Sequence, residues 1–146
     1  MTNGVSAFWC NWLIAVAAAV SLFSALLLFA PAVGQQIFDA IYFFTLEPQP
    51  LPAERETNYL RFTNGVLGAV MIGWMCLIAV VANGPFRRGE AWAWTAIAAS
   101  IGAWFVTDTT FSLARGVTGN ALFNTAVVVA FAVPLLASRA SFRRLS

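Results

Sequence analysis

The chain of 146 residues contains no histidine and no lysine, and its eight basic residues are all arginine. Without histidine there is no imidazole to act as a base, to ligate haem or to complete the common zinc sites. Without lysine no Schiff base can form, which excludes a retinal-binding pigment. A G-x-x-x-x-G-K-[ST] loop is also missing, which excludes a Walker-type nucleotide site. We therefore predict neither a cofactor nor a metal site.

Charge is scarce as well. Charged residues make up 10% of the chain, whereas a soluble domain carries about 25%. Hydrophobic residues make up 60%, so the few charges cannot cover a water-facing surface and lipid is the expected solvent. The net charge of +2 is too small to indicate nucleic acid as a partner. The two cysteines, Cys10 and Cys76, lie in separate apolar runs, which favours buried free thiols over a disulfide or a metal pair.

Four apolar segments are long enough to cross a bilayer core, which takes about 20 helical residues. The predicted fold class is an all-α integral membrane protein, with one domain over residues 1–146 and four transmembrane helices in an antiparallel bundle. Ala30-Pro31-Ala32 resembles a signal-peptidase site, but no basic residue precedes the first segment, so we expect a retained helix. The predicted spans are about 8–33, 58–82, 90–113 and 120–137.

A fifth segment, residues 35–46, is too short to cross. Its apolar side chains crowd one side, whereas Gln35, Asp39 and Thr45 are polar. This pattern predicts an amphipathic helix that lies on the membrane surface or over the end of the bundle; a hydrophobic loop is the alternative. The segment that follows is predicted to be an extended linker because it contains three prolines. They are Pro48, Pro50 and Pro52.

The arginines predict the orientation, because cytoplasmic loops carry an excess of basic residues. With the N-terminus inside, five arginines are cytoplasmic and three are outside, and the outer loop also carries three glutamates. We therefore expect a bacterial inner-membrane protein with both termini cytoplasmic. The inner arginines are Arg87, Arg88, Arg139, Arg143 and Arg144, and the outer ones are Arg55, Arg61 and Arg115.

This orientation gathers polar residues at the outward end. Asp108 and Arg115 are two turns apart on one face of the third span, and Trp104 lies one turn below Asp108. Asp108 lies roughly 7–8 Å inside the boundary, where a charge is costly unless it is paired. The pair could be a clasp between helices, a ligand or ion site, or a protonatable carboxylate for transport. The other members of the predicted cluster are Asn120, Asn124, Arg61 and Asn64.

Small residues recur at four-residue spacing in two of the predicted spans. The second span has Gly65, Ala69 and Gly73, and the third has Ala98 and Gly102. That spacing places them on one face of each helix, where another helix can approach closely. The pattern predicts tight packing, either within one protomer or between protomers.

Three segments resemble DoxX-like small four-helix bacterial membrane proteins. They are Pro31–Gly34, Tyr59–Gly65 and the Arg87-Arg88 turn, followed by two closing helices. The resemblance covers most of the chain and rests on hydropathy and a few glycines. It implies a four-helix membrane fold and, because some members are linked to quinone or redox partners, a quinone as a candidate ligand. It also implies an arginine near the end of the third helix, where this chain has Asp108 followed by Arg115.

The predicted function is a membrane-embedded binding or interaction module with its polar cluster at the outward end and membrane lipid as a partner. One alternative is an accessory subunit of a larger complex, or a homo-oligomer. Another is a small ion- or proton-coupled transporter that uses Asp108. An enzyme is least supported, because no candidate base or nucleophile motif accompanies the acid.

Overall fold

The computed structural model describes residues 4–45, 47, 49, 50 and 52–143. This part of the chain is all-helical and contains no strand, as the sequence predicted. Three predicted features, Arg144, Pro48 of the linker and the end of a helix at Leu46, lie outside the described residues. The elements are α1 (Ala7–Phe29), α2 (Pro31–Phe43), α3 (Glu54–Val81), a π-helical turn η1 (Ala82–Phe86), α4 (Ala91–Ala114) and α5 (Thr118–Arg143).

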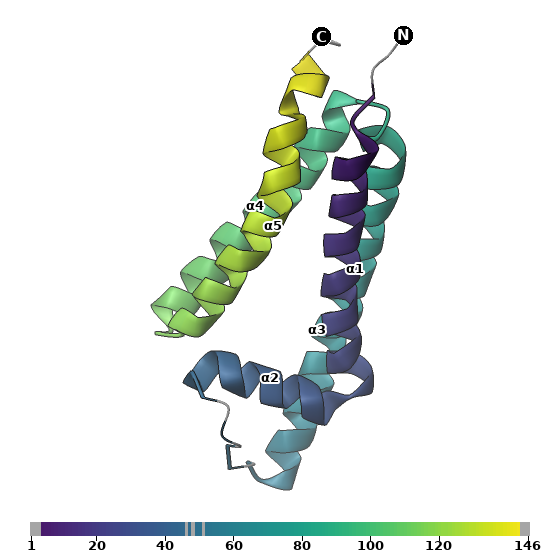
Figure 1. The fold of residues 1–146 in the computed structure, drawn as a ribbon. Coiled ribbons are helices and arrows are strands. Elements are labelled where there is room, and N and C mark those ends of the chain that lie inside the picture. The colour runs from purple at the N-terminus through teal and green to yellow at the C-terminus, as the bar shows by residue number, and fades with distance from the viewer. Residues whose placement is uncertain (1–3, 46, 48, 51, 144–146) are drawn as a thin grey trace.

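The helices form two antiparallel pairs (Figure 1). Helix α1 lies along α3, and α4 lies along α5. The pairs meet at the end of the bundle that carries Val5, Phe86 and Phe142, which we call the terminal end, and they separate toward the other end. There α2 crosses from the base of α1 to the start of α5, and we call this the α2 end.

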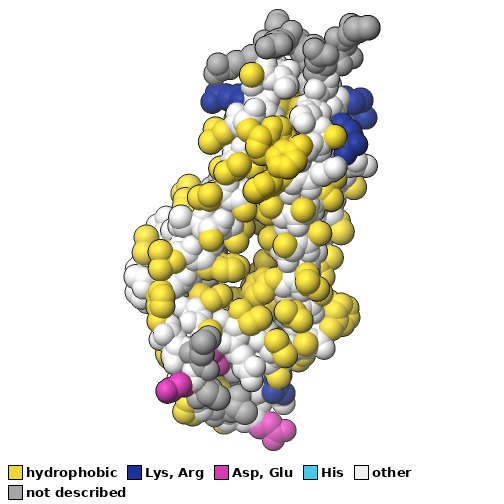
Figure 2. Space-filling view, viewed as in Figure 1, with side chains coloured by type: hydrophobic (Ala, Val, Ile, Leu, Met, Phe, Trp, Pro, Cys, Tyr) yellow, Lys and Arg dark blue, Asp and Glu magenta, His cyan; other side chains and the backbone are white. Residues whose placement is uncertain are grey.

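Three helices are long and apolar enough to cross a membrane, by length and composition: Ala7–Phe29, Glu54–Phe86 and Thr118–Phe142. Helix α4, with 24 residues, is not one of these three, and it carries Asp108. Hydrophobic side chains extend over most of the visible face, with basic side chains toward the terminal end and both acidic and basic side chains at the α2 end (Figure 2).

The first helix ends earlier than the predicted limit at residue 33. Helix α1 ends at Phe29, and Pro31 is the first residue of α2. Proline suits this position because its fixed φ matches a helix and its missing N–H would have no partner there. Helix α2 ends at Phe43, and the next residue, Phe44, has a φ of 55°. The short helix predicted over residues 35–46 is therefore present as Pro31–Phe43.

Large side chains fill the terminal end. Phe86 is fully buried, and its ring lies 5.0 Å from that of Phe142. The backbone N–H of Val5 donates to the carbonyl of Arg87 at 3.1 Å, and Arg87 Nη2 donates to Asn11 Oδ1 at 3.0 Å. These contacts fasten the start of α1 to the turn between α3 and α4.

A salt bridge also lies in this turn. Arg88 Nε donates to the Glu90 carboxylate at 2.7 Å, just before α4 begins. Hydrogen bonds from Arg88 and then Trp92 hold the pKa of the Glu90 carboxyl below its usual value. The Arg88 side chain is 65% exposed and that of Glu90 is 37% exposed, so solvent screens the pair and it contributes little to stability.

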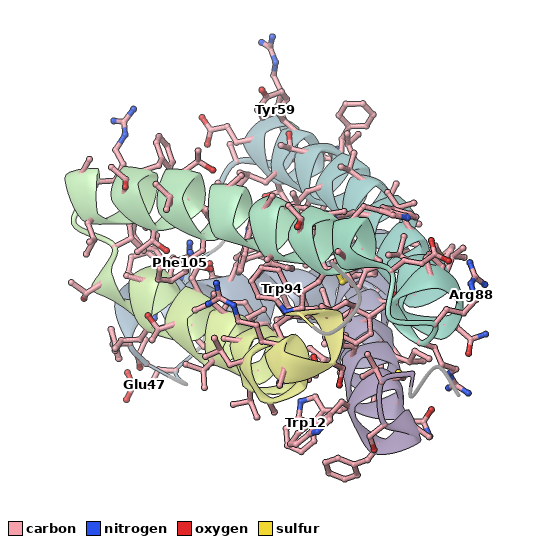
Figure 3. The ribbon with its side chains drawn as sticks, turned by 90° about the horizontal axis from the view of Figure 1, so that it is seen from above. Trp12, Glu47, Tyr59, Arg88, Trp94 and Phe105 are labelled. Atoms are coloured by element: carbon pink, nitrogen blue, oxygen red, sulfur yellow. The ribbon has the colours of Figure 1, made fainter. Side chains whose placement is uncertain are left out.

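Two indole groups join other helices to α5. Trp12 Nε1 donates to the carbonyl of Ala130 at 3.0 Å, and Trp94 Nε1 donates to that of Leu135 at 2.8 Å. The carbonyl of Ala130 would normally accept from residue 134, but Pro134 has no N–H. Trp12 of α1 therefore supplies the donor that α5 lacks. Figure 3 shows both labelled indoles from the terminal end.

Glycines bring backbones together at the α2 end. A Cβ at Gly68 would lie 2.5 Å from the carbonyl oxygen of Ser24, where α3 meets α1. A Cβ at Gly34 would lie 2.8 Å from the Leu27 side chain. A Cβ at Gly119, at the start of α5, would collide with the carbonyl oxygen of Ile41 in α2.

The small-residue faces predicted from the sequence lie partly elsewhere. A Cβ at Gly65 would lie 3.6 Å from the Leu28 side chain, but Ala69 is exposed. Positions Gly73 and Gly102 have nothing within 4 Å in the described chain. Ala98 packs against the core. Within one protomer, α3 therefore meets α1 through Gly68, one residue before Ala69 and on a different face of the helix.

Candidate functional site

A polar cluster joins α4 and α5 near the α2 end, and it is centred on Asp108. Asn124 Nδ2 donates to Asp108 Oδ2 at 3.0 Å and to Thr109 Oγ1 at 3.3 Å. Asn120 Nδ2 donates to Ser112 Oγ at 2.7 Å and reaches the Asp108 carboxylate at 3.4 and 3.5 Å. We call Asp108, Thr109, Ser112, Asn120 and Asn124 the Asp108 cluster.

The helices position this cluster by their periodicity. Asp108 and Ser112 are four residues apart on α4, and the Ser112 hydroxyl donates to the Asp108 carbonyl at 2.8 Å. Asn120 and Asn124 are likewise four apart on α5, so both amides face α4. Asn124 is only 1% exposed. Because a carboxylate only accepts hydrogen bonds and an amide nitrogen only donates, the pairing between the two helices is chemically matched.

The predicted clasp between Asp108 and Arg115 is absent. Arg115 lies beyond the last residue of α4, is exposed, and has its guanidinium 5.5 Å from the centre of the Phe111 ring. The salt bridge found in the described chain joins Arg88 and Glu90 instead. Arg115 follows Asp108 by seven residues, which is about 10 Å along a helix axis. The side-chain amides of α5 therefore reach Asp108 more closely than Arg115 does.

Two other residues of the predicted cluster also lie elsewhere. Arg61 of α3 lines a separate pocket beside α2, and its Nε is buried with no hydrogen-bond partner in the described chain. Asn64 is half-buried on α3, outside the Asp108 cluster. Trp104 points into the bundle, where its ring lies 6.0 Å from that of Trp74. The structure therefore brings together Asp108, Asn120 and Asn124 from the predicted set.

A pocket of about 900 Å³ opens beside the Asp108 cluster. Helix α2, the linker after it and the ends of α3, α4 and α5 form its walls. We call it the Asp108 pocket. Its polar lining includes Gln35, Asp39, Asp108, Ser112, Arg115 and Asn120. A bound molecule there would meet hydrogen-bond acceptors, a hydroxyl group and one guanidinium.

A second cavity, of about 370 Å³, lies between the two helix pairs. All four long helices contribute to it, and its lining is apolar throughout. We call it the apolar cavity. Its larger lining side chains are Phe23, Met71, Trp74, Trp104, Phe123 and Phe131.

Three aromatic rings connect the linings of these two spaces. The Phe23 ring lies 6.0 Å from that of Phe38, which lines the Asp108 pocket. It lies 5.7 Å from that of Phe123, which lines the apolar cavity. On α4, Trp104 of the apolar cavity and Asp108 are one turn apart. A pocket with several polar side chains in its lining and an apolar cavity therefore lie next to each other along the bundle.

Several residues of the site were missed by the sequence prediction. Ser112 carries a usable signal, because it lies four residues after Asp108 on the same face. Gly119 precedes Asn120, and its lack of a side chain lets α2 reach the start of α5. Asp39 was predicted only as the polar side of a surface helix, yet it lines the Asp108 pocket. Its position depends on where α2 lies, which its own sequence does not determine.

In the part of the chain that the structure describes, no three His, Cys, Asp or Glu side chains are grouped so that they could hold a metal ion. No family model, curated protein or solved structure matches the chain. The resemblance to DoxX-like proteins therefore stays a prediction.

Proposed function

We propose that the chain is an inner-membrane protein with four spans, α1, α3, α4 and α5, and with both termini in the cytoplasm. The exposed apolar side chains along these helices support a lipid environment. Helix α4 lies antiparallel to α5, so it would cross wherever α5 crosses. Arg87, Arg88 and Arg139 at the terminal end support a cytoplasmic location for that end.

Cysteine labelling would test this orientation. In a Cys10→Ala, Cys76→Ala background, Glu54→Cys at the α2 end should react with an impermeant maleimide in intact spheroplasts. Arg88→Cys at the terminal end should react only after the membrane is permeabilised. The reverse pattern would contradict the proposed orientation.

The function we propose is binding of a membrane-soluble amphiphile at the α2 end. Its apolar part would occupy the apolar cavity, and its head group would occupy the Asp108 pocket. The observation that carries this proposal is that the two spaces adjoin along α4, with Trp104 lining one and Asp108 lining the other. Ligand sites combine an apolar lining with a few convergent polar groups in this way.

The chemistry of the pocket favours a head group that carries a hydroxyl. The Asp108 carboxylate accepts hydrogen bonds, so a ligand must donate to it. Ser112 and Asn120 can exchange hydrogen bonds with a neighbouring oxygen, and Arg115 lines the same pocket. A quinol or a hydroxyl-bearing lipid, such as a diacylglycerol, meets these requirements.

The test is binding of a quinol and of diacylglycerol to the purified, delipidated protein in detergent, followed by native mass spectrometry and by the melting temperature. We expect one of them to bind and to raise the melting temperature. Asp108→Asn should weaken binding, as should Ala126→Phe, which adds a ring to the wall of the apolar cavity. Thr107→Ala, on the exposed side of α4, is the matched control.

Two outcomes would refute the amphiphile site. One is the absence of binding by either ligand to the folded protein. The other is binding that is unchanged in both Asp108→Asn and Ala126→Phe, while each variant remains folded without ligand.

A second candidate function is that of an accessory subunit in a larger membrane complex. Gly73 and Gly102 favour it, because a Cβ at either position would meet nothing within 4 Å. Such surfaces could receive a helix of another chain. Native mass spectrometry directly from membranes should then detect a protein partner at fixed stoichiometry, and a protein that is always recovered alone would count against this role.

A further inference from the structure

A third pocket, of about 890 Å³, lies on α2 and adjoins the Asp108 pocket, with which it shares Gln35, Asp39, Ile41 and Gln49. Helix α2 forms one wall, and Arg61 of α3 and the start of α5 form others. We call it the Arg61 pocket. Its polar lining includes Gln35, Gln36, Asp39, Thr45, Glu47 and Arg61. Apolar residues such as Val33, Ile37 and Leu122 complete the lining, so the pocket is amphiphilic.

Opposite charges share this pocket without pairing. Arg61 and Asp39 both line it, yet they form no salt bridge with each other or with any other described residue. The Nε of Arg61 is shielded from solvent and has no hydrogen-bond partner in the described chain. A buried donor without a partner destabilises the protein, so a ligand that accepts a hydrogen bond from Arg61 would remove this penalty.

The two charges differ in what they can bind. A guanidinium offers planar donors that match the oxygens of a phosphate. A carboxylate accepts hydrogen bonds from an ammonium group, which has three donors. A purely anionic ligand would place its charge near Asp39 and Glu47 as well as Arg61. A ligand with both a phosphate and an ammonium group satisfies both sides of the pocket.

We propose that the Arg61 pocket binds the head group of an amine-bearing zwitterionic phospholipid, of the phosphatidylethanolamine type. The phosphate contacts Arg61 and the ammonium contacts Asp39. The pocket lies at the α2 end, where the proposed membrane placement puts lipid head groups. The inference rests on that placement, but it does not require a ligand in the Asp108 pocket.

The experiment compares lipids with different head groups on the delipidated full chain. Phosphatidylethanolamine, phosphatidylcholine and phosphatidylglycerol with identical acyl chains are added singly, and bound lipid is counted by native mass spectrometry. We expect phosphatidylethanolamine to bind at least about tenfold more tightly than either of the others, which corresponds to about 1.4 kcal/mol. Phosphatidylcholine has a phosphate, but its methylated ammonium cannot donate hydrogen bonds, so it isolates the contribution of Asp39.

Variants of Asp39 and Arg61 test which of these residues causes the preference for phosphatidylethanolamine. Asp39→Asn should abolish the preference for phosphatidylethanolamine over phosphatidylcholine, and Arg61→Gln should weaken binding of all three lipids. Arg61→Lys, which keeps the charge without the planar donors, should give intermediate binding and serves if Arg61→Gln does not fold. Arg55→Gln is the matched control, because Arg55 is exposed on α3 and does not line the pocket.

The outcomes are distinguishable. Equal binding of the three lipids, or a preference that survives Asp39→Asn, would overturn the proposal. Soluble glycerophosphoethanolamine tests the source of the head group, and protection from melting equal to that given by the lipid would overturn a lipid ligand. Asp108→Asn should leave phosphatidylethanolamine binding intact, so failure of the amphiphile site and failure of this site can be told apart.

Discussion

The two ends of the bundle are held together differently. At the terminal end, large side chains such as Leu13, Phe86 and Phe142 are buried in one apolar core. At the α2 end, Gly68 and Gly119 bring backbones together, and buried amides bind a carboxylate. The Asp108 pocket and the Arg61 pocket border α2, and the apolar cavity adjoins the first of them. We therefore place ligand binding toward this end.

The largest expected effect is loss of a core side chain at the terminal end. Phe86→Ala should lower the free energy of unfolding by about 3–5 kcal/mol, because the ring is fully buried and leaves a cavity. Phe123→Ala, the same change beside the apolar cavity, should cost clearly less, since Phe123 is only partly buried. Unfolding in mixed micelles measures the free energy of unfolding of both variants. Equal losses would contradict the proposed difference in packing between the two ends.

The Asp108 cluster should show the next largest effect. Asp108→Asn places an amide donor opposite Asn120 and Asn124, and we expect a loss of about 1–3 kcal/mol from the lost acceptor. Arg115→Gln should be nearly neutral, because Arg115 is exposed and does not pair with Asp108. The same unfolding assay applies to both. If the double variant Asp108→Asn, Arg115→Gln were more stable than Asp108→Asn alone, the result would support the clasp between Asp108 and Arg115 that the sequence suggested.

Helix contact at the α2 end can be tested with two glycines of α3. Gly68→Ala should destabilise by about 1–3 kcal/mol, because its Cβ would lie 2.5 Å from the Ser24 carbonyl oxygen. Gly73→Ala should instead stabilise by about 0.5–1 kcal/mol, since it meets nothing and alanine favours the helix. Melting temperatures of the two variants give the comparison. Destabilisation by Gly73→Ala, together with a change in oligomeric state, would indicate contact between protomers.

The smallest expected effect concerns the link between the helix pairs. Trp12→Phe removes the donor to the Ala130 carbonyl, and hydrogen bonds between membrane helices contribute about 0.6 kcal/mol on average. Pro134→Ala restores an N–H within α5, so the loss of the indole donor should matter less in that background. A double-mutant cycle on unfolding free energies measures this coupling. Additive effects would show that the indole contributes packing alone.

Some features could be predicted because they belong to single segments. The helices from Ala7 and from Thr118 contain long apolar stretches, and hydropathy depends on composition alone. The amide pair on α5 was also predictable, because residues four apart share a helix face. The hydrogen-bond partner of Asp108 could not be predicted in this way. It depends on the height and rotation of α5 beside α4, and the nearest charge in the sequence was not the nearest donor in space.

By itself, the sequence determined an all-helical chain, the approximate limits of its long apolar helices, and Asp108 as the centre of polar chemistry. The tertiary structure decided that Asn124 rather than Arg115 binds Asp108, and that Gly68 rather than Ala69 meets α1. It also decided that α2 borders two pockets. The physical reason is geometric. One residue along a helix turns a side chain by about 100°, so the choice of partner is made by how whole helices pack.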